Sequence, residues 1–576
     1  MLIRLQESPC DKIGITHHRI KNILHEGKLC IPSFVFGFLG RYCRFVDVYE
    51  RWRNPFLADS ENPIAHGFCD QRDSTNLSGP LPSSHENGEV LEKNDYQYEW
   101  LGPGHFGGLI SGLYPDGKRT IWSNGREQIV KLDYETLETL STFDLSHERP
   151  GEVFSDHSEW EDGIANLDNF DEEEELISSA IGLAARFMTG LDGVYSLLDV
   201  DHVMHLGRKE GVVAYAETDP SDRNSSLIEK DRWNKPDEIK GSFVGINMTP
   251  DGRLVLSTDH GWLVSLSRDF ENYVAVQIPG AEKQAEEHCK NMEIEKGNTA
   301  YGWVRTSMCC DEEGGIYLNS VDHLHRVVWN GKNFSFADED GAWSAEYRNG
   351  TGTGSGTTPS LMGDDPNGNR FVVIGDGDEV VNITLFWRAA IPDDWECLPN
   401  APSRRIAGLG AANMGDLSRE SIQTEQSITV AGYGAMTVNN EPSTRPSWLP
   451  ERASRLLSFF LGHYQAFTPY GLHKYEWDPK TAEFREAWVN REVSSPNSVP
   501  YVSVGSNVVY TCGTREGKWT IEALNWSTGE SLGYWVTGDS RFNTLGSGVQ
   551  LDNDGQIVFG SIFGKSRILR LPLKNI

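Results

Sequence analysis

A repeated pair of short strands is the feature that most limits how this chain can fold. Each copy has a Gly-containing turn, a short apolar run, a polar turn and a second apolar run, as in "PDGRLVLSTDHGWLVSLS" at residues 250–267. Asp-Gly and Asn-Gly supply the positive φ that tight hairpin turns need. Clear copies begin at Pro115, Pro250, Glu312, Pro366, Gly505 and Asn553, and degenerate copies begin at Asp199 and Ser427. Repetition of this kind predicts a β-sheet repeat fold.

The spacing of the copies predicts the architecture. Their second strands begin near Arg119, Val203, Arg253, Gly315, Arg370, Ile428, Asn507 and Ile557. Most of these starts lie roughly 50 to 62 residues apart, which suits a four-stranded propeller blade with its loops. We therefore expect an all-β, eight-bladed β-propeller, or a seven-bladed one if the unit at Ser427 is not a full blade.

Several copies continue into a third strand through an outer turn. The segments are "KLDYETLETLSTF" (131–143), "YEWDPKTAEFREAW" (475–488) and "ALNWSTGESLGYW" (523–535). The last resembles the blade motif of the quinoprotein-like (PQQ-type repeat) propeller superfamily, which has eight blades. Residues 62–80 are similar to the polar lead-in of that class. The resemblance extends over about three blades as a pattern, and no specific family within the superfamily is identified.

The two ends of the repeat region predict how the ring closes. The last unit lacks an outer strand, while "YQYEWLG" at 96–102 alternates like a strand just before the first unit. We expect residues 96–102 to complete the last blade, because closure removes two open sheet edges. This gives a partly irregular N-terminal extension (1–94) and a propeller (95–576). A separate N-terminal module is the alternative.

The charge of the chain limits its partners. With 52 Lys and Arg against 84 Asp and Glu, the formal net charge is −32, so this acidic protein would repel nucleic acid. No clustered basic patch suits a membrane surface. The apolar segment 30–40 is too short for an unaided membrane span, and whether it anchors or packs stays open. The first residues do not resemble a signal peptide, so the compartment stays open, with a cytoplasmic location slightly favoured. The oligomeric state is not predicted.

Three long insertions indicate which face carries the function. They span 146–176, which runs on into a helical pattern at 177–188, then 280–300, and 442–471, which contains a helix candidate at 450–461. In a propeller these loops reach the same face, so we expect short helical insertions on one face. Long loops on a rigid scaffold commonly carry function. The Pro-Asp-Gly turns belong to the opposite face.

Polar groups in the turns of that face are the candidate site. His105, His260 and His323 are the candidate acid–base or metal-binding groups. Asn124, Arg126, Asp259, Asp322 and Asp376 are the candidate ligand contacts. The Asp-His pairs at 259–260 and 322–323 occupy matching turns, so they are either a site or the same turn made twice. The metal, if any, is not assigned.

The resemblance implies PQQ and Ca²⁺ as possible cofactors, but the cofactor stays unassigned. Cys309-Cys310 is similar to the vicinal disulfide that lies against the quinone in some quinoprotein alcohol dehydrogenases. Here, however, the pair ends an inner strand, on the side away from the candidate face. The calcium-binding Glu, Asn and Asp set of those enzymes cannot be placed either, and no CxxC pair with zinc spacing or HExxH motif occurs.

Two functions remain open from the sequence. One is a quinoprotein-like propeller that binds a small-molecule or polymeric ligand on its loop-decorated face, without established catalysis. The other is an enzyme, such as a lyase, a hydrolase or a PQQ-linked dehydrogenase, that uses the His and Asp groups of that face. The sequence does not decide whether the chain is an enzyme, because a fold hosts many functions.

Overall fold

The described part of the chain belongs to one compact unit, which runs from Arg51 to Ile576. The computed structural model describes residues 52–64, 74–81, 88–149, 153, 157–167, 169–188, 190–281, 301–363, 365, 367–442, 444–449, 454–538 and 540–569. The apolar segment 30–40 and most of the insertion at 280–300 lie outside the described residues. No helix among the described residues is both long enough and apolar enough to cross a membrane.

Antiparallel four-stranded sheets are the repeating element of the fold. Five sheets contain four strands each, and their strands follow in hydrogen-bonding order. They are β4 (Leu109–Ile110), β5 (Thr120–Asn124), β6 (Gln128–Asp133) and β7 (Thr139–Asp144); β8 (Ser196–Leu198), β9 (Met204–Arg208), β10 (Gly211–Glu217) and β11 (Leu227–Asn234); β12 (Phe243–Met248), β13 (Leu254–Thr258), β14 (Trp262–Leu266) and β15 (Tyr273–Gln277); β21 (Ser360–Met362), β22 (Phe371–Gly375), β23 (Asn382–Trp387) and β24 (Ile406–Ala411); and β33 (Val549–Leu551), β34 (Ile557–Gly560), β35 (Gly564–Ile568) and β3 (Tyr96–Trp100).

Two larger sheets complete the described strands. The first has five strands: β16 (Cys309–Cys310), β17 (Gly315–Asn319), β18 (His323–Trp329), β19 (Phe334–Ser335) and β20 (Trp343–Glu346). The second has ten: β25 (Thr429–Ala431), β26 (Gly434–Val438), β27 (Tyr470–Asp478), β28 (Glu483–Ser494), β29 (Tyr501–Ser503), β30 (Val508–Arg515), β31 (Lys518–Asn525), β32 (Ser531–Gly538), β1 (Ser74–Thr75) and β2 (Glu89–Val90).

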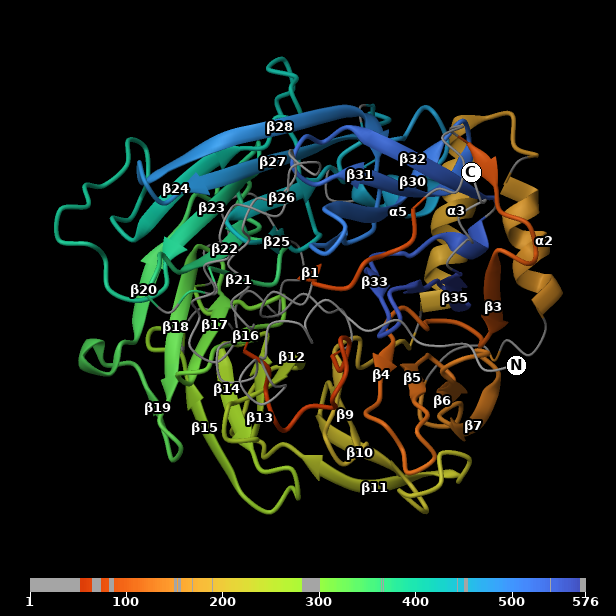
Figure 1. Cartoon of the computed structure of the whole chain (residues 1–576), viewed down its shortest axis with the longest axis horizontal. Helices are drawn as coiled ribbons and strands as arrows, with labels where there is room; N and C mark the ends of the chain where they lie inside the picture. Colours follow the sequence, from red (N-terminus) through yellow and green to blue (C-terminus); the bar gives the residue numbers. More distant parts are fainter. Residues whose placement is uncertain are drawn as a thin grey trace, which may run out of the picture. The chain divides into compact units, whose positions relative to one another are not determined.

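The ten-stranded sheet consists of two successive meanders, β25–β28 and β29–β32, which are joined where Ser494 pairs with Thr514. The sheets follow one another in chain order around a common axis (Figure 1). The chain is therefore a β-propeller, as the repeats predict. Counting the meanders separately gives eight groups of four or five strands, whereas the hydrogen-bonded sheets number seven in the described residues. The number of blades stays a prediction.

The first and last parts of the described chain share a sheet. Strand β3 pairs antiparallel with β35, with Tyr96 opposite Ile568 and Trp100 opposite Gly564. This pairing covers the outer edge of the last sheet, so β35 presents no unpaired backbone groups. Strands β1 and β2 also pair with the propeller, through β29 and β32. The domain boundary at residue 94 stays a prediction, although both strands precede it.

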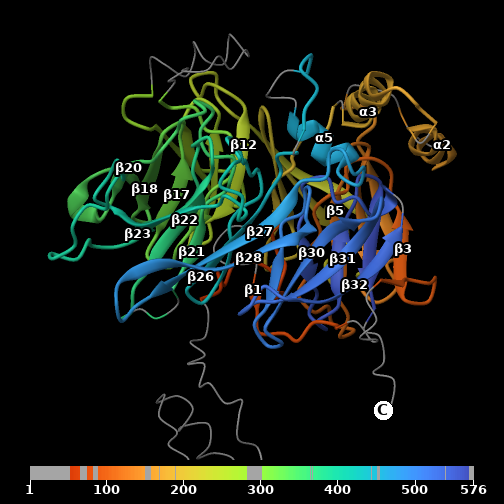
Figure 2. The same cartoon turned by 90° about the horizontal axis from the view of Figure 1, so that it is seen from above.

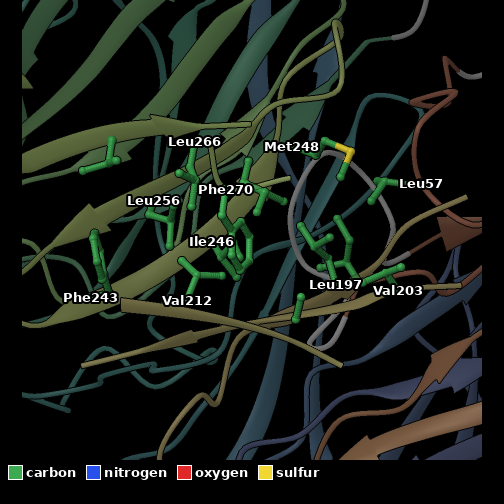
Figure 3. Packing of buried hydrophobic residues seen from close by; sticks show 14 of the residues in the cluster. Leu57, Leu197, Val203, Val212, Phe243, Ile246, Met248, Leu256, Leu266 and Phe270 are labelled. Carbon is green, nitrogen blue, oxygen red and sulfur yellow. The ribbon is translucent and has the colours of Figure 1, made fainter. Parts of the chain in front are cut away.

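Apolar side chains fill the spaces between neighbouring sheets. Figure 3 shows one such cluster, in which Val212 of β10, Ile246 of β12 and Leu256 of β13 pack together. Alternation along each strand sends successive side chains to the two neighbouring clusters. Leu57, which belongs to no strand, joins the same cluster and is 3% exposed. Its burial contributes about 1.5–3 kcal/mol to holding the N-terminal segment on the propeller.

The described N-terminal residues 54–64 lie on one face of the propeller. Asn54 donates to the carbonyl oxygens of Met248 and Thr249, at 3.1 and 2.9 Å. Asn62 donates to Leu551 O at 2.6 Å, in the sheet that contains β33. Since these acceptors lie in or beside the Gly-containing turns after β12 and β33, the segment covers the face to which those turns belong.

The helices lie on the opposite face (Figure 2). They are α2 (His157–Leu167), α3 (Glu173–Met188) and α5 (Ser454–Leu461), with short 3-10 helices η2 (Asp338–Asp340) and η4 (Ser540–Phe542) elsewhere. Leu167 of α2, Ile177 of α3 and Leu457 of α5 share one buried cluster. The expectation of helical insertions on one face is confirmed, although α2 was not expected. The acidic first turn of α3 suits the positive end of its dipole.

Candidate functional site

The two Asp-His pairs adopt the same local geometry. In the turn between β13 and β14, Nδ1 of His260 lies 2.8 Å from Oδ1 of Asp259, which also accepts a hydrogen bond from the backbone of Ser242. In the turn between β17 and β18, Nδ1 of His323 lies 2.7 Å from Oδ1 of Asp322. Each carboxylate therefore orients the ring of the residue that follows it.

The second pair borders an aromatic cluster. The Tyr301 ring lies 5.0 Å from that of His323 and 5.6 Å from that of His325. His325 is buried, with Nδ1 2.7 Å from Ser344 Oγ and Nε2 2.9 Å from Ser320 Oγ. Burial, and then the neighbouring His323, lowers the pKa of His325 to about 3, so its ring is neutral at pH 7. His325 is structural, whereas His323 is partly exposed.

The candidate residues of the first sheet make structural contacts. His105 is fully buried, with Nδ1 2.9 Å from Ser123 Oγ, and burial lowers its pKa to about 3. Asn124 donates to the carbonyl oxygens of Asp192 and Gly193. Arg126 donates to Arg186 O in α3 at 3.1 Å. These contacts join the first sheet to α3 and to the loop before β8.

Asp376 is also enclosed. Its carboxylate accepts hydrogen bonds from the backbone and the side-chain amide of Asn382, both at 2.8 Å. Burial raises the pKa of Asp376 to about 7 despite these bonds. Tyr347 joins this group to Asp322, because its backbone N–H donates to Asp322 O and its ring hydroxyl interacts electrostatically with both carboxylates. Asp322 and Asp376 thus share Tyr347 as a neighbour, while His105 lies in the loop before β4.

An arginine–glutamate–arginine cluster on the helix-bearing face was not among the predicted residues. Arg305 lies in the loop that leads into β16, and its Nη2 donates to both oxygens of Glu425, at 2.9 and 2.7 Å. Glu425 precedes β25. Arg455, in the first turn of α5, contacts Oε1 of the same carboxylate. All three side chains are partly exposed, at 22%, 25% and 16%.

Buried asparagines hold α5, and with it Arg455, in place. Asn497 and Asn543, in the loops before β29 and β33, both donate to Phe459 O of α5, at 2.8 and 2.9 Å. These bonds satisfy a carbonyl group near the end of the helix, where no intrahelical donor remains. Ser458 Oγ donates to Asn440 O, and Asn440 Oδ1 accepts from the backbone N–H of Glu425. One network therefore positions both Arg455 and Glu425.

The cluster carries a net positive charge. Burial, and then the like charge of Arg305, lowers the pKa of Arg455 to about 10. Burial also lowers the pKa of Arg305, and arginine side chains keep their proton in proteins. Two cations face one carboxylate, which leaves one positive charge unbalanced within the cluster. Arg305 also donates to Ser355 O at 3.1 Å and interacts electrostatically with the hydroxyls of Tyr347 and Tyr195. The site therefore suits an oxyanion that hydrogen-bonds to arginine.

The calcium and quinone that the resemblance implies stay unassigned. In the described part of the chain, no three His, Cys, Asp or Glu side chains gather as ligands of one metal ion. Cys309 and Cys310 are both buried in β16 and belong to different hydrophobic clusters on its two sides. No step of chemistry is therefore assigned to either cofactor.

Comparison with known proteins identifies a relative. No protein-family model matches the chain. An uncharacterised protein of Archaeoglobus fulgidus is 32% identical over 390 residues, which cover 66% of this chain and 70% of the relative. The chain belongs to the family of that archaeal protein. Membership of this archaeal family says nothing of activity, because the relative's function is itself uncharacterised.

Solved structures resemble the chain at the level of the fold. A quinohemoprotein alcohol dehydrogenase of Comamonas testosteroni has a TM-score of 0.49 and 11% identity, over 90% of this chain and 80% of its own. A quinohemoprotein alcohol dehydrogenase of Pseudomonas putida HK5 has a TM-score of 0.46 and 11% identity, over 88% of this chain and 80% of its own. At 11% identity and TM-scores below 0.5, these structures establish neither the class nor the activity of this chain, and the quinoprotein-like class stays a prediction. The fold itself rests on the strand order described above.

Proposed function

We propose that this member of the archaeal family is a ligand-binding propeller, whose ligand binds through an anionic group at Arg305 and Arg455 on the helix-bearing face. The observation that carries the proposal is the convergence of two arginines on one carboxylate, one from the loop before β16 and one from the insertion that contains α5. A partly exposed ion pair contributes only about 0–1 kcal/mol, so a second arginine beside the Arg305–Glu425 pair adds little to stability. It does supply a donor for an added oxyanion.

The surroundings of the cluster favour a small polar ligand. Tyr347 and Tyr195 interact electrostatically with Arg305, although the buried Tyr347 hydroxyl already bonds to Ser320 O and to the backbone N–H of Ser355. The net charge of −32 would repel anions from most of the surface, so a local positive charge makes this position selective. Arginine binds carboxylate and phosphate groups through the same charge-assisted hydrogen bonds, so a carboxylate and a phosphate both serve as probes.

Calorimetric titration with citrate and with inorganic phosphate tests the proposal. We expect saturable binding of at least one probe, with a Kd at least tenfold higher in Arg455→Gln. Arg455→Lys, which retains the charge, keeps most of the affinity. Arg485→Gln is the matched control, because Arg485 is an exposed arginine of β28 that pairs with Glu483. Absence of binding of both probes, or equal affinity in Arg455→Gln, would contradict the proposal.

The Asp322–His323 pair supports a second candidate, a hydrolase or lyase. Its Nδ1–Oδ1 hydrogen bond of 2.7 Å directs the other ring nitrogen, Nε2, away from the carboxylate. A ring held in this way can accept a proton at Nε2 from a substrate or a water molecule. The site then combines a base with the nearby anion-binding cluster, to which Tyr347 connects it.

Hydrolysis of p-nitrophenyl acetate tests this second candidate. Turnover should fall at least a hundredfold in His323→Ala and should remain in His147→Ala, whose side chain is exposed in the loop after β7. Asp322→Asn should lower turnover as well, because it removes the group that orients the ring. Equal turnover in His323→Ala and the wild type removes this candidate.

A further inference from the structure

A pocket of about 620 Å³ lies outside the Arg305 cluster, between the loop that follows α5 and the hairpin that joins β30 to β31. Its volume falls within the range of about 300–1,000 Å³ that small-molecule sites occupy. Both segments supply polar and aromatic side chains to its wall. Those that the argument uses are His463, Tyr464, Gln465, Tyr470, Arg515 and Glu516.

The guanidinium of Arg515 is held rigidly at this pocket. Its Nε and Nη2 donate to the carboxylate of Glu522, at 3.0 and 2.8 Å. Glu522 is fully buried and also accepts from Thr520 Oγ1 at 2.6 Å. The guanidinium lies 4.2 Å from the centre of the Tyr534 ring. This leaves Nη1 without a partner among the residues that the structure describes, as a donor of fixed direction.

An aromatic surface forms the other part of the wall. The rings of His463 and Tyr464 lie 4.4 Å apart, and the buried Trp519 ring lies 5.6 Å from His463. Tyr470, at the start of β27, is 42% exposed. Aromatic rings with a polar edge offer a flat apolar face together with a hydrogen-bonding group. The pocket therefore combines flat faces with planar polar side chains.

The charges of the pocket disfavour an anionic ligand. Glu522 neutralises Arg515, and Glu516 adds a carboxylate to the wall. We propose that this pocket binds a neutral saccharide. Its C–H faces would pack on Tyr464 and Tyr470, while its hydroxyl groups would bond to Arg515 Nη1, Gln465 and Glu516. Planar amide, carboxylate and guanidinium groups can each bond to adjacent hydroxyls of one ring.

This proposal does not depend on the anion site. Titration calorimetry with maltose, cellobiose and chitobiose tests it on the full chain. We expect at least one of these disaccharides to bind saturably. Tyr470→Ala should raise its Kd at least tenfold. Tyr273→Ala is the matched control, because Tyr273 begins strand β15 and is exposed to a similar extent, 41%.

Arg515→Gln tests the polar part of the pocket. This variant also leaves the buried Glu522 without its arginine partner, so Gln465→Ala is used instead if Arg515→Gln does not fold. Either should weaken disaccharide binding at least fivefold and leave citrate binding unchanged. Failure of all three disaccharides to bind, or equal affinity in Tyr470→Ala and the wild type, overturns the proposal. Neither outcome bears on the Arg305 cluster, whose probes are anions.

Discussion

Arg305 and Glu425 form an ion pair with a shortest nitrogen–oxygen distance of 2.7 Å, although 120 residues of sequence separate them. The pair exists because the loops before β16 and β25 both reach the centre of the helix-bearing face. Arg455 contacts the same carboxylate from α5, which lies in the insertion between β26 and β27. A ring of sheets thus brings together charges that no local sequence pattern joins.

The anchoring of α5 leads to the first prediction. Asn497→Ala removes the bonds to Phe459 O and to Asn543, at 2.8 and 2.7 Å, in a fully buried position. We expect the free energy of unfolding to fall by about 1–3 kcal/mol, the cost of leaving buried groups unpaired. Urea denaturation measures this change. The control variant Asn333→Ala, in an exposed turn, should change the free energy of unfolding by less than about 0.5 kcal/mol. Similar stabilities of the two variants would show that α5 is held by other contacts.

The N-terminal segment is predicted to be part of the folded unit. Asn54→Ala removes two buried hydrogen bonds, to Met248 O and Thr249 O, and a partly buried one that Asn54 Oδ1 accepts from the backbone N–H of Phe56. The unfolding free energy should fall by about 1–2 kcal/mol, because each buried bond contributes about 0.5–1.5 kcal/mol. Limited proteolysis should then cut the segment near residue 54 faster than in the wild type. An unchanged cleavage rate would contradict its role.

A buried ion pair joins the first two sheets. Lys131 Nζ of β6 lies 2.6 Å from Glu217 Oε1 of β10, and both side chains are almost fully buried. Glu217→Gln leaves the lysine charge without its partner and should cost about 3–5 kcal/mol. The double variant Lys131→Met, Glu217→Gln should recover part of this loss, as measured by thermal unfolding. A double variant no more stable than Glu217→Gln would show that the lysine charge is not the cause.

The pKa of Asp376 predicts a pH dependence of stability. Burial raises this pKa from its ordinary value of 3.8 to about 7. The folded state therefore holds a proton that the unfolded chain releases, so the contribution of Asp376 to stability is present below pH 4 and falls as the pH rises to 7. Between pH 5 and 7, the free energy of unfolding of Asp376→Asn should fall by about 2 kcal/mol less than that of the wild type. Equal losses in urea titrations at the two pH values would refute this assignment.

The sequence predicts the fold because its signals are local. Each Gly-containing turn and the apolar runs around it form one hairpin, such as β13 and β14 in the copy at Pro250. The helix pattern at 177–188 likewise belongs to α3. Helix α2 is less apolar overall than α3, with an exposed Glu159 and a central Gly163, so its packing on α3 stabilises it.

The candidate site was less predictable from the sequence. Turn position identifies the Asp259–His260 and Asp322–His323 pairs and their matching geometry, but the assignment of function to them stays a prediction. Arg305, Glu425 and Arg455 carry no motif, and their meeting depends on how three distant loops fold over the ring. The one available signal is the polar sequence just before an inner strand, as at "TEQS" (424–427).

The most direct test of the anion site is a crystal structure of the chain grown with citrate. Our account predicts citrate on the helix-bearing face, with carboxylate oxygens within hydrogen-bonding distance of Arg305 and Arg455. Citrate bound at other residues, with this cluster unchanged and empty, would contradict it.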